Sequence, residues 1–244
     1  MQIEGKTALI TGGAHRVGKA ITMTLAEAGA NVVVNYYSSD TAAQETVREA
    51  EALGVGALAV QADIGEMDQV RNLVAAAAER FGAVDILVNS ASIWLKTPMP
   101  MGDFGDWHRV LGVLLDGSMY LADSVAPMMQ ARGEGAMVNI VDLSAWKPFA
   151  GYIAHSVGKA GLLALTRQLA LELAPAVSVN AVAPGPVLPP PDYSPEQVAR
   201  VAARTLKGRW GVAQDVADAV RFLVAADYIT GEVIVVDGGE RLTS

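Results

Sequence analysis

Residues 152–166, YIAHSVGKAGLLALT, are small and apolar except for two basic side chains. His155 and Lys159 lie four positions apart, so in a helix they share one face. An apolar helix face normally packs against the rest of the protein, and burying a lysine there is unfavourable unless something polar meets it. The pair therefore indicates that this face lines a site.

A second stretch with chemical meaning is TGGAHRVGKA, residues 11–20, which follows a short apolar run and leads into a helical pattern. Glycines at a strand-to-helix turn let backbone amides approach a pyrophosphate, and the helix N-terminus adds partial positive charge. A glycine pair alone could equally be a tight turn without a ligand. Its place in the first crossover of the chain favours dinucleotide binding.

The elements that position these stretches alternate along the whole chain. Short β-branched runs are predicted as strands at 7–11, 31–35, 57–61, 86–89, 137–142, 177–183 and 233–237. Helical patterns lie between them at 17–28, 41–53, 67–81, 106–131, 152–173 and 214–225. This alternation predicts an α/β fold of one domain, residues 1–244, with a doubly wound seven-stranded parallel sheet and helices on both faces.

One region breaks the alternation. Residues 183–197 contain six prolines, which predicts a loop because proline removes backbone hydrogen bonds. We expect a substrate lid over about 184–205. Polar residues also end the predicted strands, in QADI, ILVNSAS and VNAVAPGP, at the edge where such sheets bind ligands. Asp63 of QADI is placed to meet an adenine amino group.

Composition limits the class of partner. The formal net charge is −8 and no run of Lys or Arg occurs, which argues against nucleic acid and against anionic membrane surfaces. No apolar stretch approaches the roughly 20 residues of a membrane helix, and the N-terminus lacks a signal-peptide pattern, so we expect a cytoplasmic protein. There is no cysteine and the three histidines are widely separated, so no metal site is expected.

Taken together, these motifs resemble the short-chain dehydrogenase/reductases, whose fold is the Rossmann fold. The likeness rests on Thr11, Gly12 and Gly18, on NSAS in place of Asn-Asn-Ala-Gly, on Lys159, on Pro184 with Gly185, and on Asp237 to Gly239. The resemblance implies an oxidoreductase that transfers hydride between a nicotinamide nucleotide and a C=O or C=N substrate. It also implies a homotetramer through the long helices near 106–131 and 152–173, although apolar residues there, such as Met119, Leu162 and Leu165, could instead face the sheet.

Within this family the chain looks most like the pteridine reductases. Arg16 stands where a middle glycine is usual, Trp94 follows the NSAS turn, and Asp142 replaces the usual catalytic serine. The implied substrate is a pteridine-like heterocycle, with a ketone or a 3-oxoacyl thioester as the broader expectation. Trp94 is placed to stack a flat ring against the nicotinamide, or else simply packs under the lid.

The choice of nucleotide depends on the end of the second strand. An acid there favours NAD, and an Arg pairs with the 2′-phosphate of NADP. Here Asn35 carries no repelling charge, and Ser38 and Ser39 can donate hydrogen bonds to a phosphate, so NADPH is predicted, with NADH as the alternative. The predicted cofactor-binding residues are Gly12, His15, Arg16, Val17, Gly18, Asn35, Tyr36, Ser38, Ser39, Asp63, Ile64, Asn89, Ser90, Ala91, Lys159, Pro184, Gly185 and Val187.

The catalytic residues depart from the family. The resemblance places a tyrosine where His155 stands and an asparagine where Leu114 stands, which leaves Asp142, His155 and Lys159 as the predicted catalytic set. Imidazolium is a competent acid near neutral pH, because imidazole ordinarily titrates near pH 6.5 and phenol near 10. The predicted substrate pocket consists of Ser92, Trp94, Ser144, Trp146, Tyr152 and Pro186. The alternative is a protein that binds the nucleotide and has lost its chemistry.

Overall fold

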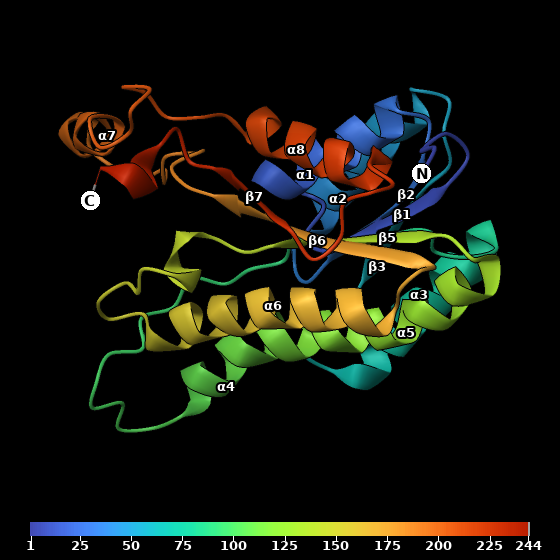
Figure 1. Ribbon diagram of the computed structural model, residues 1–244, viewed down its shortest axis with the longest axis horizontal. Coiled ribbons are helices and arrows are strands. Elements are labelled where there is room, and N and C mark those ends of the chain that lie inside the picture. Colours follow the sequence, from blue (N-terminus) through green and yellow to red (C-terminus); the bar gives the residue numbers. More distant parts are fainter. Residues whose placement is uncertain (244) are drawn as a thin grey trace.

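Seven parallel strands form one sheet in the centre of the molecule, as Figure 1 shows. The structure is a computed structural model, and it describes residues 1–243. The sheet order is β3-β2-β1-β4-β5-β6-β7, which is the doubly wound order predicted from the sequence. The strands are β1 (Thr7–Ile10), β2 (Asn31–Tyr36), β3 (Ala57–Gln61), β4 (Ile86–Asn89), β5 (Gly135–Ile140), β6 (Val177–Pro184) and β7 (Val233–Val236).

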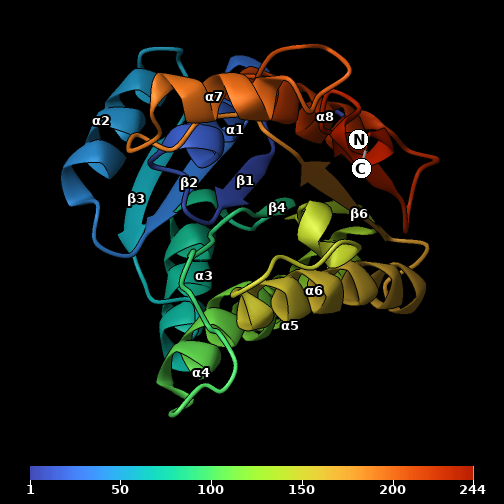
Figure 2. The same ribbon diagram turned by 90° about the vertical axis from the view of Figure 1, so that its left-hand side faces the viewer.

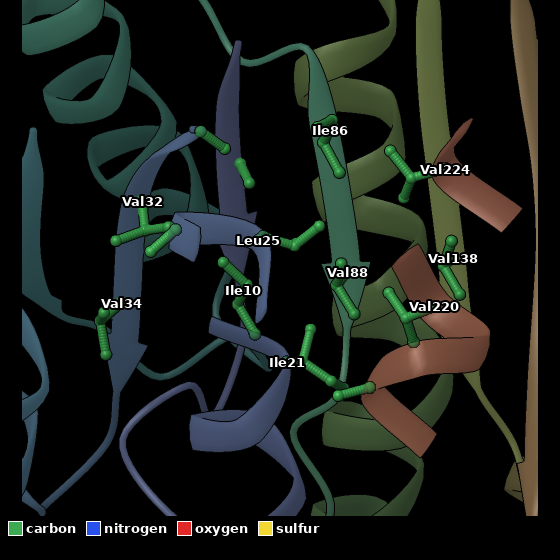
Figure 3. Packing of buried hydrophobic residues seen from close by; sticks show 14 of the residues in the cluster. Ile10, Ile21, Leu25, Val32, Val34, Ile86, Val88, Val138, Val220 and Val224 are labelled. Carbon is green, nitrogen blue, oxygen red and sulfur yellow. The ribbon is translucent and has the colours of Figure 1, made fainter. Parts of the chain in front are cut away.

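Helices cover both faces of the sheet. One layer contains α1 (Arg16–Glu27), α2 (Asp40–Glu51) and α8 (Ala213–Ala225), and the other contains α3 (Met67–Phe81), α5 (Gly117–Arg132) and α6 (Ile153–Glu172). Figure 3 shows Ile21 and Leu25 of α1 and Val220 of α8 lying over side chains of the central strands. Alternate strand residues point to opposite faces, so Ile10 belongs to this core and Leu9 to the core under α3 and α5.

The lid differs from the sequence prediction. Residues 183–197 were expected to be a loop, but Pro195 begins a helix, α7 (Pro195–Ala202). Ser194 caps it, since its hydroxyl accepts from the amide of Gln197 and the Gln197 side chain accepts from the Ser194 amide. Proline is well tolerated at the first helical position, where its missing N–H has no partner to lose. Figure 2 shows α7 on the side of the sheet that carries α1 and α8.

Three other boundaries were also wrong. The helix expected over 106–131 is divided into α4 (Gly105–Leu111), a π-helical segment at Gly112–Asp116, and α5. The fifth strand begins two residues earlier than predicted and ends at Ile140, so Asp142 lies beyond it. There Asp142 caps a short 3₁₀ turn, Leu143–Ala145. The helix predicted at 152–173 begins one residue later, which makes Tyr152 the residue that precedes α6. Among residues 1–243, no helix combines the length and apolar character that crossing a bilayer needs.

Thr11 joins the two loops that border the site. Its hydroxyl accepts hydrogen bonds from the amides of Ser90 (2.9 Å) and Ala91 (3.0 Å). The side chain is fully buried at the end of β1, so no water replaces it there. The turn after β1 and the turn after β4 are therefore held in register by one side chain.

Replacing Thr11 with valine should destabilise the fold by about 2 kcal/mol, because the shape is kept while two amides lose their acceptor. The matched control is Thr46→Val, since Thr46 is equally buried but its hydroxyl donates only to Ala42 in its own helix. Urea unfolding measures both changes. Equal denaturation midpoints for the two variants would contradict the assignment.

Candidate active site

A groove of about 680 Å³ runs along the carboxyl edge of strands β1 to β4. It contains most of the residues predicted to bind the nucleotide: Gly12, His15, Arg16, Val17, Gly18, Asn35, Tyr36, Ser38, Ser39, Asp63, Ile64, Ser90 and Ala91, together with Ser92 from the predicted substrate pocket. Sequence reasoning missed Tyr37, Gly65, Glu66, Ile93 and the α4 side, His108, Arg109, Gly112 and Val113. Nothing in the local sequence marks the α4 residues, because only the tertiary fold brings that helix to the groove.

The turn after β1 leaves the N-terminus of α1 open. A Cβ at Gly18 would collide with the carbonyl oxygen of Gly12, so only glycine allows this close approach. No side chain caps α1 and its first turn carries no acid. Its free amides and partial positive charge therefore face the groove, which fits a pyrophosphate.

Arg16 occupies the position where the related family has glycine, and its backbone shows why. Its φ is +49°, in the left-handed region that favours glycine. Its guanidinium donates to the carbonyl of Leu188 at 3.1 Å, so it contacts the lid. The role predicted for Arg16 at the pyrophosphate stays a prediction.

The adenosine end of the groove is bordered by the ends of β2 and β3. Asn35 is buried and donates to the carbonyl of Ala62 (3.1 Å), so its side chain ties β2 to β3. Tyr36 donates its hydroxyl to Asp40 at 2.7 Å. This hydrogen bond, burial and the charge of Asp40 all raise the pKa of Tyr36. Asp63 accepts from the amide of Gly65, which fixes the turn after β3, and its role at an adenine amino group stays a prediction.

The predicted catalytic residues meet beyond the end of β5. His155 Nε2 lies 2.7 Å from Asp142 Oδ2, and Lys159, one turn further along α6, donates Nζ to the carbonyl of Ile140 at 2.6 Å. The other carboxylate oxygen of Asp142 accepts from the amide and the hydroxyl of Ser144. His155 and Lys159 are buried, with 2% and 3% of their surfaces exposed.

Burial and neighbouring charges shift the pKa values of Asp142 and Lys159 in this cluster. Burial raises the pKa of Asp142, but the hydrogen bond from His155 and the charge of Lys159 outweigh it, so the pKa lies below its ordinary value. Burial lowers the pKa of Lys159, and attraction to Asp142 only partly opposes that effect. Asp142 is thus an anion held between two nitrogen groups, and it orients the ring of His155.

Both ring nitrogens of His155 have an oxygen partner. Nδ1 lies 3.3 Å from the carbonyl of Ile93, while Nε2 contacts Asp142. Both partners are acceptors, so the doubly protonated ring satisfies both contacts. The longer Nδ1 contact is the weaker of the two, since N–H···O bonds are usually 2.7–3.2 Å long.

Trp94 contacts His155 and two aromatic side chains. Its indole stacks on Tyr152 with ring centroids 4.3 Å apart, and meets His155 (4.4 Å) and Phe149 (5.8 Å) edge to face. Half of Trp94 remains exposed, at 52%. Of the other predicted pocket residues, Ser144 is buried against Asp142, Trp146 is exposed, and Pro186 accepts from the amide of Gly211.

Leu114 replaces the expected asparagine with an apolar contact. It is buried with Val110 and Ala154, in a small cluster between α4 and α6. A Cβ at Gly158 would lie 3.1 Å from Leu114 Cβ, which shows how closely the two helices approach. The π-helical segment at Gly112–Asp116 therefore presents an apolar side chain, Leu114, to α6.

Some predicted cofactor residues lie outside the main groove. Asn89 is buried and donates to Asn139 at 2.8 Å, so its amide links β4 to β5 inside the sheet. Its side-chain oxygen is buried without a hydrogen-bond partner in the described chain. Gly185 packs against Asp237, where a Cβ would be 2.6 Å from the Asp237 Cβ. Pro184, Val187 and Lys159 likewise do not line the groove around the β1 turn.

Comparisons with known proteins agree with this geometry. A family model described as enoyl-(acyl carrier protein) reductase matches residues 12–240. A 3-oxoacyl-[acyl-carrier-protein] reductase from Synechocystis is 36% identical over 242 residues, covering 97% of each chain. The chain belongs to the short-chain dehydrogenase/reductases. The oxidoreductase class and the fold predicted from the sequence are confirmed at the level of this family.

Two further relatives show how widely the family varies. The 3β-hydroxysteroid dehydrogenase 1 of Eggerthella lenta is 35% identical over 248 residues, covering 98% of this chain and 95% of its own. A short chain dehydrogenase from Burkholderia cenocepacia, solved in complex with NADP, has a TM-score of 0.90 and 34% identity, covering 99% and 100% of the two chains. Relatives of nearly equal identity carry different substrate names, so overall similarity does not select a substrate. The closeness to pteridine reductases stays a prediction.

Stability should depend on pH through Asp142. Because its folded pKa lies below its unfolded value near 3.9, its contribution is complete above that value and disappears as the pH falls through the folded pKa. The native protein should therefore unfold at higher urea than Asp142→Asn at pH 7, and the gap should narrow below about pH 4. Asp68→Asn, at a largely exposed carboxylate, is the control. If the native protein and Asp142→Asn differ by the same urea midpoint at pH 7 and at pH 3, the lowered pKa of Asp142 is contradicted.

Proposed function

We propose that this protein is an NADP(H)-dependent reductase in which Asp142 and His155 together perform the proton chemistry that the family resemblance assigns to a serine and a tyrosine. The observation that carries the proposal is the 2.7 Å contact between His155 Nε2 and Asp142 Oδ2, one helical turn from Lys159. Both oxygens that meet the His155 ring are acceptors, so the doubly protonated ring makes both contacts, and an imidazolium can donate a proton.

The nucleotide would occupy the groove along β1 to β4. The uncapped N-terminus of α1 and the glycine turn are suited to its pyrophosphate, while Ser38 and Ser39 line the end where a 2′-phosphate would lie. The NADP complex of the Burkholderia relative supports this choice. When bound, the nicotinamide supplies the hydride.

The residues of this chain would divide the remaining work. Lys159 would bind the nicotinamide ribose hydroxyls and, as a buried cation, favour charge on nearby oxygen atoms. Asp142 would hold His155 in orientation through Nε2, and Ser144 fixes the carboxylate in turn. A proton delivered to a substrate oxygen or nitrogen would come from the imidazolium of His155. That delivery needs the weaker Nδ1 contact to Ile93 to open.

For the substrate we propose a pteridine-like heterocycle. The exposed side of the Trp94 indole is a flat surface near the catalytic cluster, and Asp142 can accept hydrogen bonds from ring amino groups. A ketone or a 3-oxoacyl thioester is the alternative, which the name of the Synechocystis relative supports. These classes are tested side by side below.

A second candidate function is nucleotide binding without turnover. Two observations favour it: both nitrogens of His155 are engaged, and Leu114 fills the position of the family asparagine. In that case the groove would be used for regulation or assembly.

The deciding experiment follows NADPH oxidation with dihydropterin, a small activated ketone and a 3-oxoacyl thioester. Native protein should turn over at least one of them, and His155→Phe should lower kcat/KM by about 10²–10⁴-fold, because the proton donor is lost. His155→Tyr should be no better than native, since Asp142 stands where the family serine would assist the phenol.

NADPH fluorescence titrations on the same three proteins provide the control, because none of these changes touches the groove around α1. If only His155→Tyr turns over substrate and all three proteins bind NADPH equally, the native protein binds the nucleotide without turnover. If NADPH fluorescence does not change with the native protein, both the reductase function and nucleotide binding are contradicted.

We also propose a homotetramer, which the family resemblance implies. Helices α5 and α6 lie side by side on one face, and Met119 and Val157 are exposed there. Leu162, for which the sequence left both the helix surface and the sheet open, is buried against the sheet.

Light scattering should give a mass about four times the chain mass of 25.5 kDa. Met119→Lys should lower it, because a charge would be buried at the contact. A monomeric native mass contradicts the proposal.

A further inference from the structure

The loop between β4 and α4 passes directly over the candidate proton donor. Its beginning is fixed by Thr11, which binds the amides of Ser90 and Ala91. Its other end is fixed at Thr97, whose amide donates to Gly151 at 2.8 Å and whose hydroxyl accepts from Ala154 at 3.0 Å. Between these anchors, the contact from Ile93 O to His155 is the one hydrogen bond that residues 92–96 make with the described part of the chain.

The peptide that joins Ile93 to Trp94 closes off His155 in two ways. Its carbonyl oxygen faces His155 Nδ1, and the indole that follows it contacts the imidazole ring at 4.4 Å. The exposures confirm the layering, since Trp94 is 52% exposed and His155 only 2%. Asp142 occupies the remaining nitrogen. In this arrangement no N–H of His155 is available to a substrate.

These two contacts belong to consecutive residues, so one movement breaks both. We propose that the Ile93–Trp94 peptide is a cover over His155 that the substrate itself displaces, and that Trp94 thereby selects flat aromatic carbonyl or imine compounds. The inference rests on the proposed function, because it concerns how the proton donor of that reaction becomes accessible.

The preference for flat aromatic substrates follows from the ring contacts that the Trp94 indole loses when it is displaced. Trp94 is held by stacking on Tyr152 and by edge contacts to Phe149. A flat ring restores aromatic stacking to Tyr152 or Trp94 after the movement, whereas an aliphatic ketone leaves both rings without a partner. Aliphatic substrates should therefore not displace the cover from His155, and removal of the indole should give them access to His155.

Chemical modification tests the cover without using activity. Diethyl pyrocarbonate acylates accessible imidazoles, and mass spectrometry can follow His155 separately from His15 and His108, which are exposed and serve as internal references. Native His155 should react about tenfold more slowly than His15. Trp94→Leu should remove most of that protection, while Trp94→Phe keeps an aromatic ring and should retain it.

The matched control is Phe222→Leu, which removes an equally exposed aromatic ring from α8 on the opposite layer of the sheet. It should leave His155 reactivity unchanged. The second readout is the ratio of kcat/KM for a bicyclic aromatic ketone to kcat/KM for an aliphatic ketone. This ratio should fall about tenfold in Trp94→Leu, because kcat/KM for the aliphatic ketone rises.

The outcomes separate this inference from the function on which it rests. Equal reaction of His155 in native protein and Trp94→Leu overturns the cover, even if the native protein reduces ketones. The protein could instead bind NADPH and turn over no substrate, while Trp94 still protects His155 from diethyl pyrocarbonate. That result would support the cover and contradict the proposed reductase function. Turnover with an unchanged substrate ratio in Trp94→Leu overturns the selective role of Trp94.

Discussion

The constraint on which the whole molecule depends is that parallel strands must be buried on both faces. Each crossover places a helix on one face or the other, and the two helical layers require apolar residues at almost every strand position. Val32, Val33 and Val34 of β2 are all fully buried for this reason. The same arrangement brings every strand's carboxyl end to one edge, and Thr11, Asn89 and Asp142 all lie along that edge although they are far apart in the chain.

At that edge the site depends on two residues, His155 and Asp142, which stand where the family resemblance implies a tyrosine and a serine. The imidazole can carry a positive charge, and the carboxylate supplies the opposite charge. The 2.7 Å contact between them joins the two substitutions into one electrostatic unit with Lys159. Removing either side chain would leave the other without its hydrogen-bond partner, which is unfavourable for a buried polar group. The two departures are therefore best understood together.

Leu114, which stands where the family resemblance implies an asparagine, has a different character. It is packed into an apolar cluster, and a π-helical segment presents it there. Its backbone is held by the close approach of α4 to Gly158 on α6 and of Gly117 to the carbonyl of Ile64. The irregular backbone is thus determined by helix packing, and the side chain that it presents at Leu114 is apolar.

The sequence by itself determined the class of fold, the order of strands and helices and the family, because these follow from hydrophobic periodicity and from glycines at turns. It also predicted the nucleotide groove around Gly12 and Gly18 and the grouping of Asp142 with His155 and Lys159. The start of α7 has a local signal, the capping box of Ser194 and Gln197 with Pro195 at the first helical position, and the many prolines around it hid that signal. Only the tertiary structure decided that α4 borders the groove with His108 and Arg109, and that Trp94 lies over His155. These two features depend on contacts between segments far apart in the chain, and local periodicity carries no information about such contacts.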